Sequence, residues 1–451
     1  MNPSREGERK NTSMLMRGAA GWVIACVFAV LAVRLAFFID QYAINLLYYD
    51  EWDYLNGLFE GADAWTLFRW QHGPHRQGLG NLILAVVLDG TGWNSRAVAV
   101  ASAVAMVLAG LAALVMVKRV CGRLRSWDVI VPLIFVTTTT VDSYAVTPNL
   151  AHGPLPALFL TLYALSLTVG SHATRALLIT AINFLAVNTG FTLLLGPITP
   201  VVLLLLACQP GLHSRARMAY GAACAASIAT AWHFAHDLRW APAVDCFEFP
   251  HDPPWLYAPY TGRILTRPLT LPIDAPPGEL AAGGVALLAV GFALYAACRA
   301  LRSRGSSTLW NVTSVLAAFT VVFAVATAVG RVCLGIPTAD ASRYIPYVLP
   351  GLLVGYLVIR CSVPAGRRQS LLLGLFLLAC VLKETSPRSR LEAAYDYDLK
   401  RAWRDCYLRT HDIATCNATA GRPVYPAPEA TRLQQKLDWL EARRYNLFQE
   451  R

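Results

Sequence analysis

Three carboxylates lie close together in the segment YYDEWDYL, residues 48–55. In a helix over residues 49–56, Asp50 and Asp53 would share one face and Glu51 would point elsewhere. A carboxylate next to a membrane surface could act as a general base that takes a proton from an acceptor hydroxyl. Asp50 and Asp53 together could instead hold a divalent cation, the possible cofactor of this chain. All three residues are therefore candidate catalytic groups.

The same segment also has an interpretation that involves no chemistry. Its carboxylates could form a solvated helix cap, while Tyr48, Tyr49 and Trp52 anchor the chain in the membrane interface. Aromatic side chains also pack against sugars, so Trp52 is a candidate for binding the sugar or the acceptor.

A basic segment, QHGPHR, follows at residues 71–76. Its Gly-Pro pair predicts the start of a helix, with proline in the first turn. His75 and Arg76 would then lie at a helix N-terminus, which binds phosphate through backbone N–H groups and here gains an arginine fork. His72 is a candidate sugar- or acceptor-binding residue. The alternatives are a zinc site on His72 and His75, and simple anchoring in the interface.

The segment ADASRYIP, residues 339–346, directly precedes another apolar run. Arg343 would lie at the membrane edge, where it can meet a lipid phosphate, and Tyr344 can pack or hydrogen-bond beside it. Arg331 ends the preceding apolar run, so two arginines flank a short loop. A single arginine at such a boundary usually only extends its charge towards the interface. The pair keeps both interpretations open, phosphate binding and anchoring.

Residues 236–280 form a long polar segment rich in proline and in aromatic and acidic residues. This composition suits recognition of sugars, and Trp255 is its candidate sugar-binding residue. An ordinary structured loop has the same composition.

Cys406 and Cys416 lie ten positions apart in the polar C-terminal region. In an oxidising compartment they would form a disulfide, whereas reduced thiols would favour a cytoplasmic tail.

The composition is that of a polytopic membrane protein. The 451 residues are 55% hydrophobic and only 15% charged, whereas soluble domains carry about a quarter charged residues. The net charge of +11 comes from Lys and Arg residues that mostly occupy short loops between apolar runs, so it does not indicate a nucleic-acid partner.

We predict an all-α protein of about eleven transmembrane helices, since a bilayer core of about 30 Å needs roughly 20 helical residues. The predicted spans are 18–38, 95–117, 127–146, 151–170, 176–191, 193–208, 218–235, 281–298, 309–330, 345–360 and 369–383. Residues 74–89 are expected to form a juxtamembrane helix in the interface. Gly and Pro residues within 176–208 predict two short helices that re-enter the membrane.

The basic loops set the predicted orientation. They all fall on one side under this count, which is the cytoplasmic side by the positive-inside rule. Residues 1–17 would be a cytoplasmic N-terminus, and residues 18–383 the transmembrane module. The periplasmic side would hold three loops and a small tail: residues 39–94, 236–280, 331–344 and 384–451. The richness in Ala, Arg and Gly indicates a bacterial source, so the membrane would be the inner membrane.

The motifs YYDEWDYL, QHGPHR and GRVCLGIPTADASRY, together with the many spans, resemble bacterial polytopic glycosyltransferases of the GT-C superfamily. The resemblance implies a GT-C-like bundle with juxtamembrane helices in the first outer loop. It also implies transfer of a sugar from a polyprenyl-phosphate donor to an acceptor on the periplasmic side. The sequence does not show the stereochemistry, but a single displacement by the acceptor would invert the anomeric carbon. The acceptor would be a glycan, a lipid-linked glycan or a protein such as a pilin.

The resemblance also implies roles for individual residues. Asp50 matches the position of the catalytic carboxylate, with Glu51 and Asp53 as rivals. The donor phosphate would be held by cationic and aromatic residues, namely His75, Arg76, Arg331, Arg343 and Tyr344. The chain departs from larger members in having only a short outer tail, which leaves acceptor recognition open. A transporter or flippase of lipid-linked saccharides is the alternative.

Overall fold

The chain is almost entirely helical in the computed structural model, which describes residues 3–239, 244–269 and 276–449. Parts of the predicted loop 236–280 and the last two residues of the predicted tail lie outside the described residues. Among the described residues, seven helices are long and apolar enough to cross a membrane. The protein is therefore an all-α, multi-pass membrane protein, but eleven spans are not confirmed.

The seven long apolar helices are built mainly from seven elements. These are α1 (Pro3–Tyr42), α6 (Ser95–Cys121), α10 (Leu195–Ala207, preceded by the 3₁₀ turn η3, Gly190–Leu194), α13 (Pro276–Arg302), α14 (Thr308–Arg331), α15 (Ile345–Ser362) and α16 (Arg367–Thr385).

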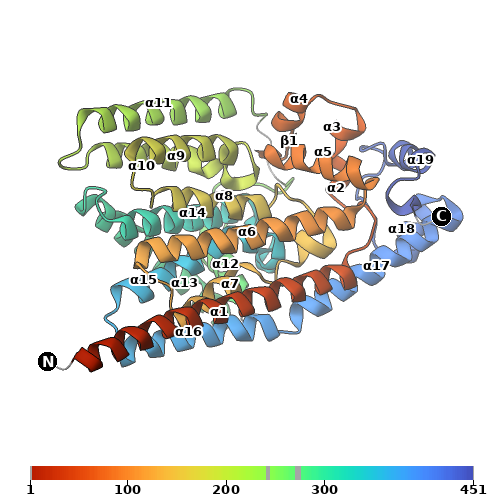
Figure 1. Cartoon of the computed structure of the whole chain (residues 1–451). Helices are drawn as coiled ribbons and strands as arrows, with labels where there is room; N and C mark the ends of the chain where they lie inside the picture. Colours follow the sequence, from red (N-terminus) through yellow and green to blue (C-terminus); the bar gives the residue numbers. More distant parts are fainter. Residues whose placement is uncertain (1–2, 240–243, 270–275, 450–451) are drawn as a thin grey trace.

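Five further helices of the described residues complete the bundle. They are α7 (Ile130–Phe135), α8 (Pro154–Ser166), α9 (His172–Val187), α11 (Ser214–His236) and α12 (Tyr257–Thr266). In Figure 1, α9, α10 and α11 form one edge of the bundle, and α1 with α16 forms the opposite edge.

Small residues let α6 and α8 pack closely in the middle of the bundle. Along α6, the buried face carries Ala99, Ser102, Ala109 and Ala113 at helical spacing. Without a hydrophobic force to join helices within lipid, such small side chains allow the close backbone approach that holds membrane helices together. The central position of α6 follows from this pattern.

The predicted span 127–146 is wrong as a continuous helix. The 3₁₀ turn η1 (Ser126–Val129) leads into α7, which ends at Phe135, and four threonines then follow in irregular structure. Glu384 compensates for the break, because its carboxylate accepts hydrogen bonds from Thr137 Oγ1 and from Arg34 Nη1, the latter at 2.7 Å. The chain resumes as a single π-helical turn, η2 (Asp142–Val146).

The segment predicted as a loop at 236–280 contains a helix of the bundle. After the 3₁₀ turn η4 (Pro254–Leu256), α12 packs against α13 and α14 and ends in η5 (Arg267–Leu269). A disulfide between Cys246 and Cys333 joins this segment to the loop that follows α14.

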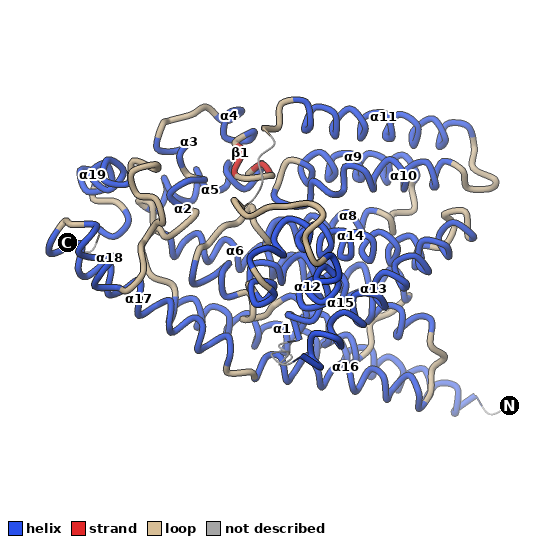
Figure 2. Tube along the Cα trace, turned by 180° about the vertical axis from the view of Figure 1, so that it is seen from behind, coloured by secondary structure: helices blue, strands red, loops and turns tan. Residues whose placement is uncertain are grey.

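The first loop and the C-terminal tail pack together at one end of the molecule. This end contains α2 (Glu51–Tyr54), α3 (Asn56–Phe59), α4 (Ala64–Arg69), α5 (Leu79–Thr91) and the hairpin of β1 (Gln71–His72) and β2 (His75–Arg76). The tail adds α17 (Arg388–Thr410), α18 (Ile413–Ala420), α19 (Leu433–Arg443) and η9 (Asn446–Phe448). Figure 2 shows the tail helices beside α2 and α3 from behind.

Basic residues gather where α6 and α15 end. Arg360 donates to the carbonyl of Arg123 at 3.2 Å and lies 3.5 Å from the buried Asp128. Cys121 and Cys361 are joined by a disulfide between the same two helices. Two of the basic loops that the sequence places on one side are thus in contact.

Candidate active site

A carboxylate from the broken span fixes the segment that carries Arg343. This segment comprises the 3₁₀ turns η6 (Val332–Leu334), η7 (Ile336–Asp340) and η8 (Ser342–Tyr344) between α14 and α15. Asp142 Oδ2 accepts hydrogen bonds from the Ser342 hydroxyl and from the Arg343 backbone N–H, both at 2.9 Å. The Asp142 N–H donates back to Ser342 Oγ at 2.8 Å. These hydrogen bonds hold together two segments that lie 200 positions apart in the chain.

Asp50, in the first loop, lies within electrostatic range of Arg343. It precedes α2, its side chain makes no capping hydrogen bond, and it is exposed. The charges of Asp50 and Asp142 both act on the half-buried Arg343 guanidinium. An exposed carboxylate therefore lies close to a cation whose backbone is fixed.

Two further residues extend this group. His152, in the turn before α8, is within electrostatic range of Arg343 and of Arg331 at the end of α14. We call Asp50, Asp142, His152, Arg331 and Arg343 the Asp50–Arg343 cluster. Its members come from five separate parts of the chain, so only the folded bundle brings them together.

Two histidines in this region, His75 and His152, have lowered pKa values. Burial lowers the pKa of His75 to about 3, and the charges of His72 and Arg331 act in the same direction. Burial also lowers the pKa of His152, with His75 and the two cluster arginines adding to the effect. The rings of His75 and His152 have centroids 5.2 Å apart, and His72 lies 6.1 Å from His75. His75 and His152 can therefore offer hydrogen bonds to a ligand without adding positive charge.

Tyr344 packs beside the Arg343 side chain. Its ring is buried, with the centroid 5.6 Å from the Arg343 guanidinium carbon. The Arg343 side chain is within hydrogen-bonding reach of the Tyr344 hydroxyl. The hydroxyl and the guanidinium could therefore contact the same bound group.

Ion pairs hold the loop that carries these residues. Arg263 of α12 makes two hydrogen bonds of 2.8 Å to the Asp340 carboxylate, and Arg388 adds one of 2.9 Å. Burial would raise the pKa of Asp340, but these hydrogen bonds outweigh burial and lower the pKa. Arg267 donates to the Asp340 carbonyl at 2.6 Å. The loop is thus fixed by side chains from α12 and α17.

Glu51 is closed to a substrate. It is 1% exposed, and its carboxylate accepts a 2.8 Å hydrogen bond from the Tyr48 N–H. Burial raises the pKa of Glu51 to about 8, although the nearby Lys400 ammonium opposes this. Lys400 in turn donates to the carbonyls of Ala145 and Val146 in η2. Glu51 therefore connects the first loop to the tail and to the turn that carries Asp142.

Asp53 does not form a free pair with Asp50. Its carboxylate accepts a 2.5 Å hydrogen bond from the Tyr425 hydroxyl of the tail. Trp52 is fully buried and stacks against Phe59, with centroids 6.4 Å apart. In the described part of the chain, no group of three or more His, Cys, Asp and Glu residues is arranged to hold a metal ion.

The prediction of a helix N-terminus at His75 and Arg76 is wrong. The Gly-Pro pair before them forms the turn of the β1–β2 hairpin, with Gly73 at a φ of 57°. Side chains that follow one another in a strand point to opposite faces. His75 therefore joins the cluster, while Arg76 pairs with Asp237 and donates to the Phe234 carbonyl at the end of α11.

The other residues singled out in the sequence are not members of the Asp50–Arg343 cluster. Trp255 is 63% exposed in η4. Cys406 and Cys416 are joined by a disulfide between α17 and α18.

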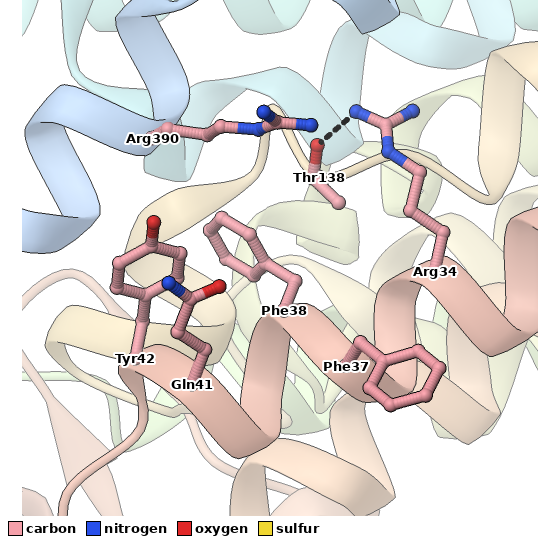
Figure 3. A pocket seen from close by; sticks show the side chains of 7 residues that line it. All are labelled: Arg34, Phe37, Phe38, Gln41, Tyr42, Thr138 and Arg390. Atoms are coloured by element: carbon pink, nitrogen blue, oxygen red, sulfur yellow. Dashed lines mark hydrogen bonds between the residues drawn. The ribbon is translucent and has the colours of Figure 1, made fainter.

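A side pocket of about 270 Å³ opens between α1, the irregular stretch after α7, and α17. Arg34 and Arg390 reach towards Thr138 from opposite sides, and Phe37, Phe38 and Tyr42 provide apolar walls (Figure 3). Arg34 donates to Thr138 Oγ1 at 3.0 Å. Apolar rings beside arginines suit an amphipathic ligand that carries a phosphate.

Sequence reasoning missed Asp142 and His152 because both were assigned to apolar spans or their ends. The signal for Asp142 was the four threonines at 137–140, followed by Pro148 and Asn149, which a continuous span would not tolerate well. Comparison with known protein families, with characterised proteins and with solved structures found no match to this chain.

Proposed function

We propose that this protein is a membrane glycosyltransferase that moves a sugar from a polyprenyl-phosphate donor to an acceptor hydroxyl. The observation that carries the proposal is the placement of exposed Asp50 near Arg343, whose backbone is fixed by Asp142. Such a reaction needs a base for the acceptor and a cation for the leaving phosphate, both within one site.

Asp50 removes the proton from the acceptor hydroxyl as the acceptor oxygen attacks the anomeric carbon. The bond between that carbon and the phosphate oxygen breaks, and its electron pair leaves with the polyprenyl phosphate. Arg343 and Arg331 stabilise the charge that develops on the phosphate. A single displacement of this kind inverts the anomeric configuration. A divalent cation is not required by these steps.

The neutral histidines and Tyr344 complete the site. His75, His152 and the Tyr344 hydroxyl donate or accept hydrogen bonds at the sugar or at the phosphate, and none of them alters the charge balance. The apolar walls of the side pocket, formed by Phe37, Phe38 and Tyr42, would receive the start of the polyprenyl chain. The active side would be the periplasmic face of a bacterial inner membrane, an orientation that the positive-inside rule favours.

The test measures sugar transfer from a polyprenyl-phosphate donor panel by the purified protein in detergent. Asp50→Asn should reduce transfer by about 100-fold or more while the thermal unfolding curve stays unchanged. Asp40→Asn is the matched control, because Asp40 is an exposed carboxylate at the end of α1 that pairs with Arg96. Equal activity of both variants would remove Asp50 from the mechanism.

A transporter of lipid-linked saccharides is the second candidate, and one observation favours it. Arg34, Lys383 and Glu384 lie within long apolar helices and form a chain of ion pairs of 2.7 and 3.2 Å. Ionisable groups at such positions often mark a transport path. If Glu384→Gln stops movement of a lipid-linked sugar across proteoliposomes while Asp50→Asn does not, and no donor supports transfer, the transporter replaces the enzyme.

A further inference from the structure

A second basic groove lies on the other face of the β1–β2 hairpin from the Asp50–Arg343 cluster. It has a volume of about 610 Å³ and is formed by α4, the hairpin and the end of α11. Its lining includes Trp65, Arg69, Trp70, Arg76, Asp237 and Arg239, and we call it the Trp65–Arg76 groove. Figure 1 shows α4 next to the end of α11, with β1 below them.

Positive charge exceeds negative charge in the groove. Three arginines face one carboxylate, so the formal charge of these side chains is 3 − 1 = +2. Asp237 bridges Arg69 and Arg76, with one carboxylate oxygen on each guanidinium. One carboxylate therefore serves two cations, and Arg239 is exposed beside them. The charge favours an anionic ligand.

Two guanidinium nitrogens are buried without partners among the described residues. They are Arg76 Nη1 and Arg69 Nε. The side chain of Arg76 is only 3% exposed, so water does not readily replace the missing partner. Burying an unsatisfied charged donor is unfavourable, whereas a phosphate oxygen would satisfy it with a strong, charge-assisted hydrogen bond.

The rim of the groove adds an aromatic surface. Trp65 is 51% exposed, and its ring centroid lies 5.8 Å from the Arg69 guanidinium carbon. An exposed indole beside a phosphate-binding guanidinium fits a ligand in which a sugar ring directly adjoins the phosphate. Inorganic phosphate alone would leave this aromatic surface unused.

We infer that the Trp65–Arg76 groove binds a glycosyl phosphate or glycosyl pyrophosphate as a second ligand of the chain. Arg69, Arg76 and Arg239 contact the phosphate, and Trp65 contacts the sugar. In the proposed reaction this ligand is the acceptor glycan on its carrier, and that role rests on the proposed function. Binding itself does not, because the groove shares no residue with the Asp50–Arg343 cluster.

The test measures binding by isothermal titration calorimetry on the full-length protein in detergent. Three probes separate the possible sources: inorganic pyrophosphate, a water-soluble hexose 1-phosphate, and a short-chain polyprenyl pyrophosphoryl sugar. Wild type should bind the hexose 1-phosphate and the lipid-linked probe more tightly than pyrophosphate. A preference for the lipid-linked probe identifies the carrier lipid as the source, and equal binding identifies a soluble glycan.

Arg69→Gln and Arg239→Gln should each weaken binding of both sugar probes by about tenfold or more, the typical loss for one charge-assisted hydrogen bond. Trp65→Leu should weaken the sugar probes but leave pyrophosphate binding unchanged. Arg299→Gln is the matched control, since Arg299 is an exposed cation over Trp310, 4.9 Å from the ring centroid. Its binding should equal that of wild type.

Asp50→Asn separates this inference from the proposed function, because it should abolish transfer but keep binding in the groove. The inference is overturned if wild type binds none of the three probes, or if the Arg69 and Arg239 variants bind as wild type does. It is also overturned if pyrophosphate binds as tightly as the sugar probes. Thermal unfolding of each variant shows whether a loss of binding comes from misfolding. Arg239 is exposed, so its variant is the one least affected by misfolding.

Discussion

Asp142 accepts a 2.9 Å hydrogen bond from the backbone N–H of Arg343, a residue 201 positions later in the chain. The same oxygen accepts from the Ser342 hydroxyl. The carboxylate therefore determines where Arg343 lies, and its charge also acts on the guanidinium. Asp142 is a positioning residue for the cation in the proposed reaction.

Replacing Asp142 should disturb this arrangement in a graded manner. Asp142→Ala removes both hydrogen bonds and should lower the free energy of unfolding by about 1–3 kcal/mol. Asp142→Asn keeps one acceptor and should destabilise less. Transfer should fall by about 100-fold in the alanine variant, since a misplacement of about 1 Å has effects of this size. Thermal unfolding and transfer kinetics check both values.

The two variants also distinguish positioning from base catalysis. If Asp142 positions Arg343, the asparagine variant should recover part of the activity that the alanine variant loses. A loss that is equally complete in both variants would instead make Asp142 the base in place of Asp50.

The burial of Glu51 should appear in the pH dependence of stability. Its pKa in the folded protein is raised to about 8, above the ordinary value of 4.5. The folded state then binds the proton more tightly than the unfolded state, so stability is full below pH 4.5 and falls as the pH rises towards 8. Glu51→Gln cannot ionise and keeps an acceptor for the Tyr48 N–H. Its melting temperature should therefore fall less than that of wild type between pH 5 and 8.

Asp63 provides the comparison for that experiment. It is exposed, and hydrogen bonds from Thr66 and Trp65 lower its pKa, so it does not titrate in the same pH range. Asp63→Asn should keep the pH profile of wild type. If the melting temperatures of wild type and Glu51→Gln change in parallel between pH 5 and 8, the Glu51 carboxyl does not titrate in that range and the prediction is wrong.

Cysteine reactivity tests the orientation. Cys121 and Cys361 lie at the basic end with Cα atoms 5.8 Å apart. If this end is cytoplasmic, a reducing compartment should keep these thiols free in cells, while Cys406 and Cys416 form their disulfide on the other side. A membrane-permeant maleimide should then label Cys121, and an impermeant one should not. If neither reagent labels Cys121 until the protein is reduced, the Cys121–Cys361 disulfide forms in cells and this end is not cytoplasmic.

The sequence predicts much of the bundle because membrane helices depend on a local property, the length of an apolar run. Most of the long apolar helices coincide with predicted spans, with small shifts at their ends. The failures arise where tertiary contacts replace local ones. After α7, Thr137 and Thr138 lie outside a helix, where Glu384 and Arg34, far away in sequence, hydrogen-bond to their side chains.

The candidate site is predictable in part for the same reason. Asp50 and Arg343 were predicted from residue types and their position beside spans. The separation of His75 from Arg76 was not, because the hairpin that places them on opposite faces depends on a two-residue turn. The burial of Glu51, and the opposing charge of Lys400 about 350 positions later, are not indicated by any local pattern.

Asn446 is the residue through which the tail holds the first loop. Its side-chain amide donates to Asn45 Oδ1, the Trp93 carbonyl and Ser95 Oγ, at distances of 2.7–3.1 Å. The Asn45 amide donates back to the Asn446 carbonyl at 2.8 Å.

Since Asn446 is fully buried, Asn446→Ala should leave several buried groups unsatisfied and lower the free energy of unfolding by about 2–4 kcal/mol. Gln449→Ala, at the exposed rim of the same junction, should cost about 1 kcal/mol or less. Thermal unfolding measures both, and limited proteolysis of the first loop should increase only in the Asn446 variant. Equal stability of the two variants would mean that the tail does not hold the loop through this residue.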